Sequence, residues 1–170
     1  GSNIPASAKP EFEIRAATER DIPQILAFVR ELADYEHLAH LVSATESGMR
    51  EALFGVHTGA EVILGYEGVT PAGFAVYFHN FSTFLGVKGL WLEDLFVRRA
   101  FRGRGYGKAL LLHVARIAAA GQLPRLAVIE DQPVEPVEHL RLDRRGRGEI
   151  EQDAHPLGFR ARDQRGVFRT

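Results

Sequence analysis

The stretch that decides the fold runs from residue 92 to residue 111 and reads LEDLFVRRAFRGRGYGKALL. Together with the two residues before them, its first six residues predict a strand over residues 90–97 with two acids, Glu93 and Asp94, at the centre. A basic, glycine-rich segment covers residues 98–108, and a largely apolar helix is predicted over residues 109–118. Three glycines at alternate positions let backbone N–H groups approach a ligand without interference from Cβ atoms. Because amides at a helix N-terminus favour an anion, the segment predicts a phosphate cradle.

Two common nucleotide-binding motifs do not fit this loop. A Walker A loop requires glycine where Arg102 stands and a hydroxyl residue where Ala109 stands. The Rossmann pattern requires a third glycine where Lys108 stands. The structural alternative is a basic turn before a well-capped helix.

Outward from this stretch, the sequence predicts alternating strands and helices. A short strand over residues 12–15 precedes a helix over residues 19–34, which Thr18 and Asp21 open with a capping box. A second helix begins after residues 43–46 and ends near Gly55. The remaining predicted strands are residues 62–66 and 73–78, joined as a hairpin, and residues 126–129. Beyond residue 129, neither helical nor strand periodicity persists.

Composition narrows the class of protein. The chain has 170 residues, 45% hydrophobic and 25% charged, which suits one domain with a real core. The formal net charge of −1 argues against a nucleic-acid-binding protein, and no apolar stretch approaches the length of a membrane span. With no cysteine there is no disulfide and no thiolate metal site. His37 and His40 are the only histidines at helical spacing, and no metal is expected.

Residues 1–11 are interpreted as a flexible leader that begins with a Gly-Ser cloning remnant and carries no secretory signal, so a cytoplasmic protein is expected.

Residues 102–107, Arg-Gly-Arg-Gly-Tyr-Gly, match the R/Q-x-x-G-x-G/A acetyl-coenzyme A motif of the GNAT N-acetyltransferases. Four further segments resemble the diamine (spermidine/spermine) acetyltransferase branch of that family in order and spacing: residues 14–18, 30–36, 73–77 and 92–97. The resemblance covers roughly residues 12–120. It implies one GNAT domain over residues 12–170, of which residues 130–170 are atypical, and a homodimer.

The resemblance also implies an α/β fold and a set of site residues. The fold would be a mixed, mostly antiparallel twisted sheet flanked by helices, with two central parallel strands that splay apart to admit the pantetheine arm of acetyl-coenzyme A. Glu93 would be the catalytic base, and Tyr35 and Glu36 would line the amine pocket. The cofactor-binding residues would be Leu95, Phe96 and Val97 through their backbone, and Arg102, Gly103, Arg104, Gly105, Tyr106, Gly107 and Lys108 at the pyrophosphate.

The chemistry of acyl transfer to an amine is consistent with that role for Glu93. A primary amine has a pKa near 10.4, so its deprotonation at pH 7 costs roughly 4–5 kcal/mol and requires a nearby proton acceptor. Consecutive strand residues point to opposite faces, so we expect Glu93 to face the site and Asp94 the other side. The alternative is that the acidic pair caps a turn or forms salt bridges.

The C-terminal quarter departs from the family. Family members carry a tyrosine acid there, but the four tyrosines, Tyr35, Tyr66, Tyr77 and Tyr106, all precede residue 109. Either the C-terminus has diverged, with residues 155–159 a remnant of the family's Gly-Phe turn, or the reading frame is disrupted near residue 129. The main hypothesis is an acetyl-coenzyme A-dependent N-acetyltransferase of a small amine, such as a polyamine or a lysine-like amino acid. The alternatives are a non-catalytic coenzyme A-binding regulatory module and a nucleic-acid-binding protein.

Overall fold

The computed structural model of the protein describes residues 10–123, 126–128, 140–142 and 148–150. The helices are α1 (Ile22–Tyr35), α2 (Glu46–Phe54) and α3 (Tyr106–Ala120), with short 3-10 turns η1 (Glu19–Asp21), η2 (Ala39–Leu41) and η3 (Arg99–Phe101). The strands are β1 (Phe12–Ala16), β2 (Glu61–Glu67), β3 (Thr70–Ser82), β4 (Val87–Val97), β5 (Leu126–Val128), β6 (Leu140–Leu142) and β7 (Gly148–Ile150). Each helix and strand predicted up to residue 128 is confirmed.

One mixed sheet organises the molecule, with strand order β1-β2-β3-β4-β5. The first four strands are antiparallel, and β5 runs parallel to β4. The expected mixed, mostly antiparallel sheet is therefore confirmed. Parallel pairing begins at Leu90 and reaches Leu92, although β4 continues to Val97. Residues 129–139, which follow β5 directly, lie outside the described residues, so the predicted splaying of the two strands stays a prediction.

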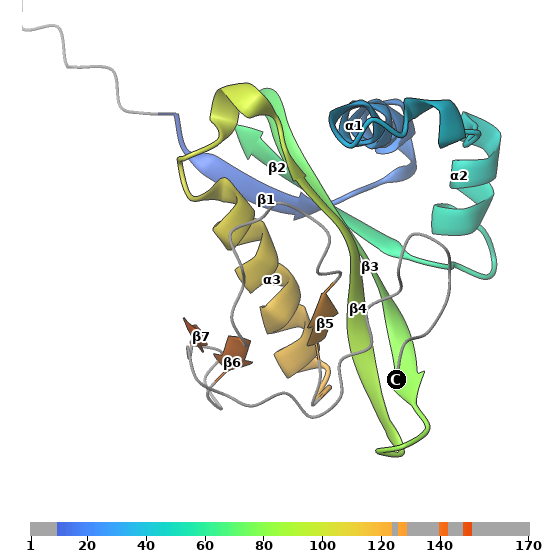
Figure 1. Ribbon diagram of the computed structural model, residues 1–170, viewed down its shortest axis with the longest axis vertical. Coiled ribbons are helices and arrows are strands. Elements are labelled where there is room, and N and C mark those ends of the chain that lie inside the picture. The colour runs from blue at the N-terminus through green and yellow to red at the C-terminus, as the bar shows by residue number, and fades with distance from the viewer. Residues whose placement is uncertain (1–9, 124–125, 129–139, 143–147, 151–170) are drawn as a thin grey trace, which may run out of the picture.

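Helices cover both faces of this sheet (Figure 1). Helix α1 packs on one face around a cluster that includes Phe28, Phe74 and Phe96. Helix α3 packs on the other face, where Leu110 and Val114 join a cluster with side chains of β2, β3 and β4. Along the strands, apolar side chains therefore point to both faces of the sheet, as is required when helices cover both faces.

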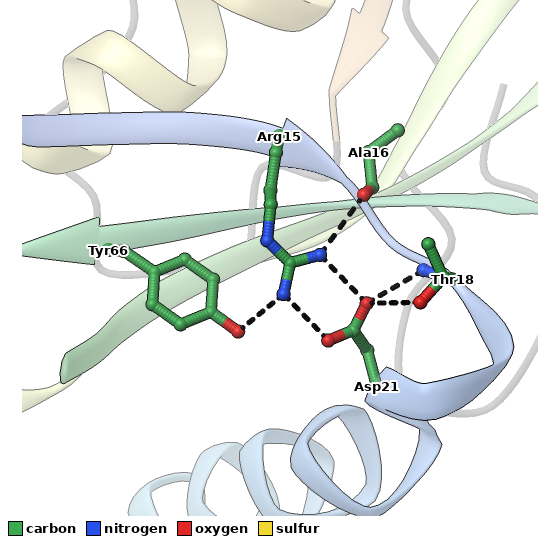
Figure 2. Close-up of polar contacts among 5 residues, drawn as sticks. All are labelled: Arg15, Ala16, Thr18, Asp21 and Tyr66. Atoms are coloured by element: carbon green, nitrogen blue, oxygen red, sulfur yellow. Dashed lines mark hydrogen bonds and ion pairs between the residues drawn. The ribbon is translucent and has the colours of Figure 1, made fainter. Parts of the chain in front are cut away.

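A polar network fixes the entry to α1 (Figure 2). Two guanidinium nitrogens of Arg15 in β1 donate to the two carboxylate oxygens of Asp21, each at 2.8 Å, and Nη2 also donates to the hydroxyl of Tyr66. The Thr18 backbone N–H and hydroxyl donate to the same carboxylate. Asp21 is only 8% exposed, and these donors hold the pKa of its carboxyl well below the ordinary value. The predicted capping box is present, and it is reinforced by an ion pair from the sheet.

Arg98, the first residue after β4, connects α1 to the sheet. Its guanidinium donates to the carboxylate of Glu31 in α1 at 2.7–3.2 Å and to the carbonyl oxygen of Pro71 in β3 at 2.9 Å. Its backbone N–H donates to the carbonyl oxygen of Ala72, and its guanidinium carbon lies 4.7 Å from the centre of the Phe28 ring. One side chain therefore holds helix α1, strand β3 and the end of strand β4 together.

Short strands β6 and β7 pair with each other in the segment where no periodicity was recognised. Each has three residues, which is too few for an alternating pattern to stand out from its surroundings. Most of residues 129–170, including the predicted remnant at residues 155–159, lies outside the described residues, as do residues 1–9 of the predicted leader.

Candidate active site

A β-bulge in β4 determines how its two acidic side chains point. Tyr77 pairs with Leu92 and Val76 pairs with Asp94, so Glu93 is the extra residue in β4. Leu92 and Leu95 both belong to the cluster under α3, although they are three residues apart. The bulge therefore changes the alternation of the strand between them.

As a result, neither Glu93 nor Asp94 lies on the α3 face of the sheet. Val76, the partner of Asp94, packs against the cluster under α1. The expectation that these consecutive acids point to opposite faces is wrong. Simple alternation fails here because the bulge inserts one residue between them.

Near this bulge, the carboxyl groups of Glu36 and Glu93 lie close enough to Asp94 to interact with it electrostatically. Glu36 caps the C-terminus of α1, so the helix brings it to the same side of the sheet. Burial and the negative charges of Glu93 and Glu36 raise the pKa of Asp94 to about 6. A cationic group at this position would relieve the repulsion between the carboxylates.

Glu93 itself is exposed, and one of its carboxylate oxygens has a protein donor. The indole N–H of Trp91 donates to Oε2 of Glu93 at 2.9 Å. This bond orients the carboxyl group. Sequence reasoning did not single out Trp91, although its i, i+2 spacing from Glu93 in a strand is a signal for a contact on one face.

Tyr35 lies between the acidic cluster (Glu36, Glu93 and Asp94) and the glycine loop, the glycine-rich segment of residues 98–108. It is the last residue of α1, next to Glu36, and its side chain is 44% exposed. The guanidinium carbon of Arg102 lies 4.4 Å from the centre of the Tyr35 ring, a cation–π contact. The structure therefore brings together the predicted amine-pocket residues and the first residue of the predicted cofactor motif.

The three residues predicted to pair with a cofactor through their backbone close strand β4. Leu95 and Phe96 are buried in the clusters on opposite faces of the sheet, and Val97 is partly buried. On one side their backbone pairs with β3. Within the described residues, no strand pairs with their other edge. That edge carries backbone donors and acceptors of the kind a pantetheine amide would match, and the Val97 carbonyl oxygen there also accepts from Arg102.

The glycine loop has the backbone geometry of an anion cradle. Gly103 and Gly105 have φ angles of 76° and 81°, a region that favours glycine, and a Cβ added at either would meet no atom within 4 Å. Gly105 is the N-cap of α3 and supplies no capping side chain. The first N–H groups of this helix have no acceptor four residues back. The loop therefore fits a pyrophosphate group.

The side chains of the loop are tied to the protein at three points. Arg102 Nε donates to the carbonyl oxygen of Val97 at 2.9 Å. Arg104 donates to both carboxylate oxygens of Glu67 in β2, at 2.6 and 2.8 Å, and the hydroxyl of Tyr106 donates to the same carboxylate. Lys108 is exposed. Glu67 was missed by sequence reasoning because it lies 37 residues before Arg104.

Comparison with known proteins identifies the family to which the chain belongs. Residues 25–140 match the model of the acetyltransferase (GNAT) family. The chain is a GNAT acetyltransferase. In an alignment of 128 positions it is 35% identical to a thialysine N-epsilon-acetyltransferase of Bos taurus, and the match covers 69% of this chain and 74% of that protein. It is 28% identical to an L-ornithine N5-acetyltransferase of Arabidopsis thaliana, over 62% of this chain and 66% of that protein.

The predicted resemblance to the diamine branch of the GNAT family is thus confirmed. A spermidine/spermine N(1)-acetyltransferase-like protein of Homo sapiens is also similar, at 30% identity over 65% of this chain, although the match covers only 17% of that protein. Among solved structures, an aminoglycoside acetyltransferase from an uncultured soil metagenomic sample superposes with a TM-score of 0.61 over 74% of this chain and 83% of that chain. At 14% identity, this likeness shows that the GNAT fold is shared.

No group of three or more His, Cys, Asp or Glu side chains in the described residues is arranged to hold a metal ion. No helix in the described part of the chain combines the length and hydrophobicity that crossing a bilayer requires.

Proposed function

We propose that the protein transfers the acetyl group of acetyl-coenzyme A directly to the amino group of a small cationic amine, such as a polyamine or a lysine-like amino acid. The observation that carries the proposal is the electrostatic interaction of Glu36 and Glu93 with Asp94, next to the contact between Tyr35 and Arg102 of the glycine loop. A cationic substrate and an anionic cofactor would meet between these two regions of opposite charge.

On the amine side, Glu93 is the proton acceptor. Its carboxyl group is exposed and oriented by Trp91, and removing a proton from an ammonium group at pH 7 costs roughly 4–5 kcal/mol without assistance. Glu36 and Asp94 hold the positive charge of the substrate, which favours the ionised form of Asp94 once the amine is bound.

On the cofactor side, the backbone of Leu95, Phe96 and Val97 binds the pantetheine arm, and the amides of residues 103–108 hold the pyrophosphate. Acetyl-coenzyme A supplies the activated thioester. The positive φ angles of Gly103 and Gly105 and the uncapped N-terminus of α3 support this assignment.

Protonation of the departing thiolate does not require a tyrosine from the C-terminal region. Tyr66 and Tyr106 are engaged in hydrogen bonds with Arg15 and Glu67, and burial raises the pKa of Tyr77 to about 12 in the core under α3. A thiol has a pKa near 8.5, so a thiolate is a tolerable leaving group at neutral pH. Loss of the family's tyrosine acid therefore slows transfer without abolishing it.

The choice among amines is guided by the relatives. Thialysine and ornithine, after which the two relatives above are named, are amino acids with an amino group at the end of the side chain. Such compounds carry two ammonium groups, as polyamines do, which suits a cluster of three carboxyl groups. A cytoplasmic homodimer, expected from the family resemblance, is part of the same proposal.

The test combines catalysis and binding on one sample. Thiol release from acetyl-coenzyme A is measured with polyamines, ornithine, lysine and thialysine, and coenzyme A is titrated by calorimetry. We expect binding, and turnover with at least one diamine-like substrate. Binding without turnover on any amine would favour the non-catalytic coenzyme A-binding module, and absence of binding would reject both.

A further inference from the structure

Glu67 of β2 binds two side chains of the glycine loop at once. Its carboxylate oxygens accept from Nη1 of Arg104 at 2.6 and 2.8 Å, and one of them also accepts from the hydroxyl of Tyr106. The Glu67 side chain is 13% exposed, so it is largely covered by these partners and their surroundings.

Tyr106 has a second anchor on the sheet. Its ring stacks on the ring of Phe12 in β1, with the centroids 3.9 Å apart and the planes 4° from parallel. Phe12 is the cross-strand partner of Glu67. Gly65 makes room for this stack, because a Cβ at that position would lie 2.5 Å from the Phe12 ring. Strands β1 and β2 thus provide one platform for the first residue of α3.

In the glycine loop, glycines beside open space alternate with residues whose side chains are held by hydrogen bonds. A Cβ on Gly103 or Gly105 would have no neighbour within 4 Å, so packing does not hold these residues. The residues between and beside them are held by Val97 and Glu67, through Arg102, Arg104 and Tyr106. The conformation of the open backbone therefore depends on these neighbouring contacts.

We propose that Glu67 is a positioning residue for the phosphate-binding loop, which it fixes against strand β2 through Arg104 and Tyr106. Arg104 acts through Glu67 and the backbone rather than by offering its charge to the phosphates. The inference rests on the proposed binding of acetyl-coenzyme A and adds to it a residue outside the family's motif.

Charge distribution supports this division of roles. Hydrogen bonds from Tyr106 and Arg104 lower the pKa of Glu67, so its carboxylate is charged and cancels the guanidinium charge of Arg104. Both carboxylate oxygens accept from the single nitrogen Nη1 of Arg104, and this charge-assisted contact, together with the hydrogen bond from Tyr106, opposes rotation of the loop. The anion then depends on backbone amides and on the helix N-terminus.

The experiment compares coenzyme A affinity, by calorimetry, in the wild type and in Glu67→Ala. Positioning predicts an affinity loss of about three- to tenfold, from the hydrogen bonds removed. Glu67→Gln, whose amide oxygen still accepts from Tyr106, recovers part of it. The matched control is Glu19→Ala, which breaks an exposed Arg–Glu pair with Arg50 and leaves affinity unchanged. If Arg104 instead binds phosphate directly, Glu67→Ala frees it, and equal or tighter binding overturns the proposal.

Two further measurements separate positioning from a general loss of structure. The fall in kcat/KM for Glu67→Ala should be larger with acetyl-coenzyme A than with S-acetylpantetheine, which ends before the pyrophosphate. Equal losses on the two thioesters overturn the proposal. Should Glu67→Ala not fold, Tyr106→Phe keeps the ring on Phe12 and removes only the hydroxyl, and the same comparison applies. A wild type that binds no coenzyme A rejects the proposed function itself, whereas a wild type that binds, with an unaffected Glu67→Ala, rejects only the role of Glu67.

Discussion

The carboxyl groups of Glu93 and Asp94, consecutive in strand β4, lie on the same side of the sheet because a bulge inserts Glu93 opposite the Val76–Tyr77 step of β3. Two acids at this point would be separated by the thickness of the sheet in a regular strand. Their proximity, with Glu36 beside them, gives the site its negative charge and gives Asp94 its raised pKa.

Replacement of the proposed base tests its role directly. Glu93→Gln keeps the shape and the acceptor for the Trp91 N–H but cannot take up a proton. We expect kcat to fall by about 10²–10⁴, with coenzyme A affinity unchanged, in thiol-release and calorimetric measurements. The exposed carboxylate of Glu13 in β1 offers the control Glu13→Gln. Full turnover in Glu93→Gln would reject the assignment.

Asp94 makes stability depend on pH in a defined direction. Its folded pKa, about 6, exceeds its ordinary value of 3.8, so the native state holds the extra proton and ionisation favours unfolding. Asp94→Asn should therefore gain stability over the wild type by about 1–3 kcal/mol as pH rises through 4 to 7. Urea unfolding at both ends of this range measures the difference. A difference that stays constant with pH would show that Asp94 titrates normally.

The same group should affect substrate binding. An ammonium group binds the ionised form of Asp94, so KM for the amine should fall as pH rises through about 6. In Asp94→Asn this part of the pH profile should flatten, while KM for acetyl-coenzyme A keeps its wild-type pH dependence. An amine KM whose pH profile is the same in both proteins would place the amine elsewhere.

The contact between Tyr35 and Arg102 should couple the two halves of the site. Tyr35→Leu removes the cation–π contact, worth about 0.5–1 kcal/mol, and should raise KM for both substrates about two- to fivefold. Tyr35→Phe keeps the aromatic ring and should behave as the wild type. Glu36→Gln, by comparison, should raise KM for the amine only. Initial rates with each substrate varied in turn distinguish these patterns.

Asp21 should contribute to stability through the network at the start of α1. Asp21→Asn weakens the bidentate pair with Arg15 and should cost about 2 kcal/mol at pH 7. Since the folded pKa lies below the unfolded one, this contribution is present above about pH 4 and is lost as pH falls through the folded pKa. Chemical unfolding should therefore show wild type and variant converging in strong acid. A gap that persists there would mean that the charge of Asp21 is not the cause.

The sequence predicted features that depend on neighbours along the chain. The capping box at Thr18, the end of α2 at Gly55 and the glycine loop before α3 all follow from local backbone requirements. These features suffice for the order of strands and helices and for the approximate place of the site.

Features that depend on pairing between distant segments could not be predicted in the same way. The bulge at Glu93 follows from how β4 registers with β3, and side-chain alternation within β4 gives no sign of it. The partner of Arg104 is Glu67, in a strand 37 residues earlier, and many other acids in the sequence would have served as well. Sequence reasoning therefore gave candidate site residues, but it did not predict the face on which Asp94 lies, nor the contacts that hold the loop.

Arg98 joins α1 to the edge of the glycine loop through Glu31, Pro71 and Ala72. Opening of α1 away from the sheet must break the hydrogen bonds to Glu31, and Arg98, which begins the loop, then keeps only its bonds to β3. Deuterium exchange of the backbone amides of α1 should consequently be coupled to exchange in the loop. A ligand that rigidifies the loop would then also slow deuterium exchange in α1, although the ligand makes no contact with that helix.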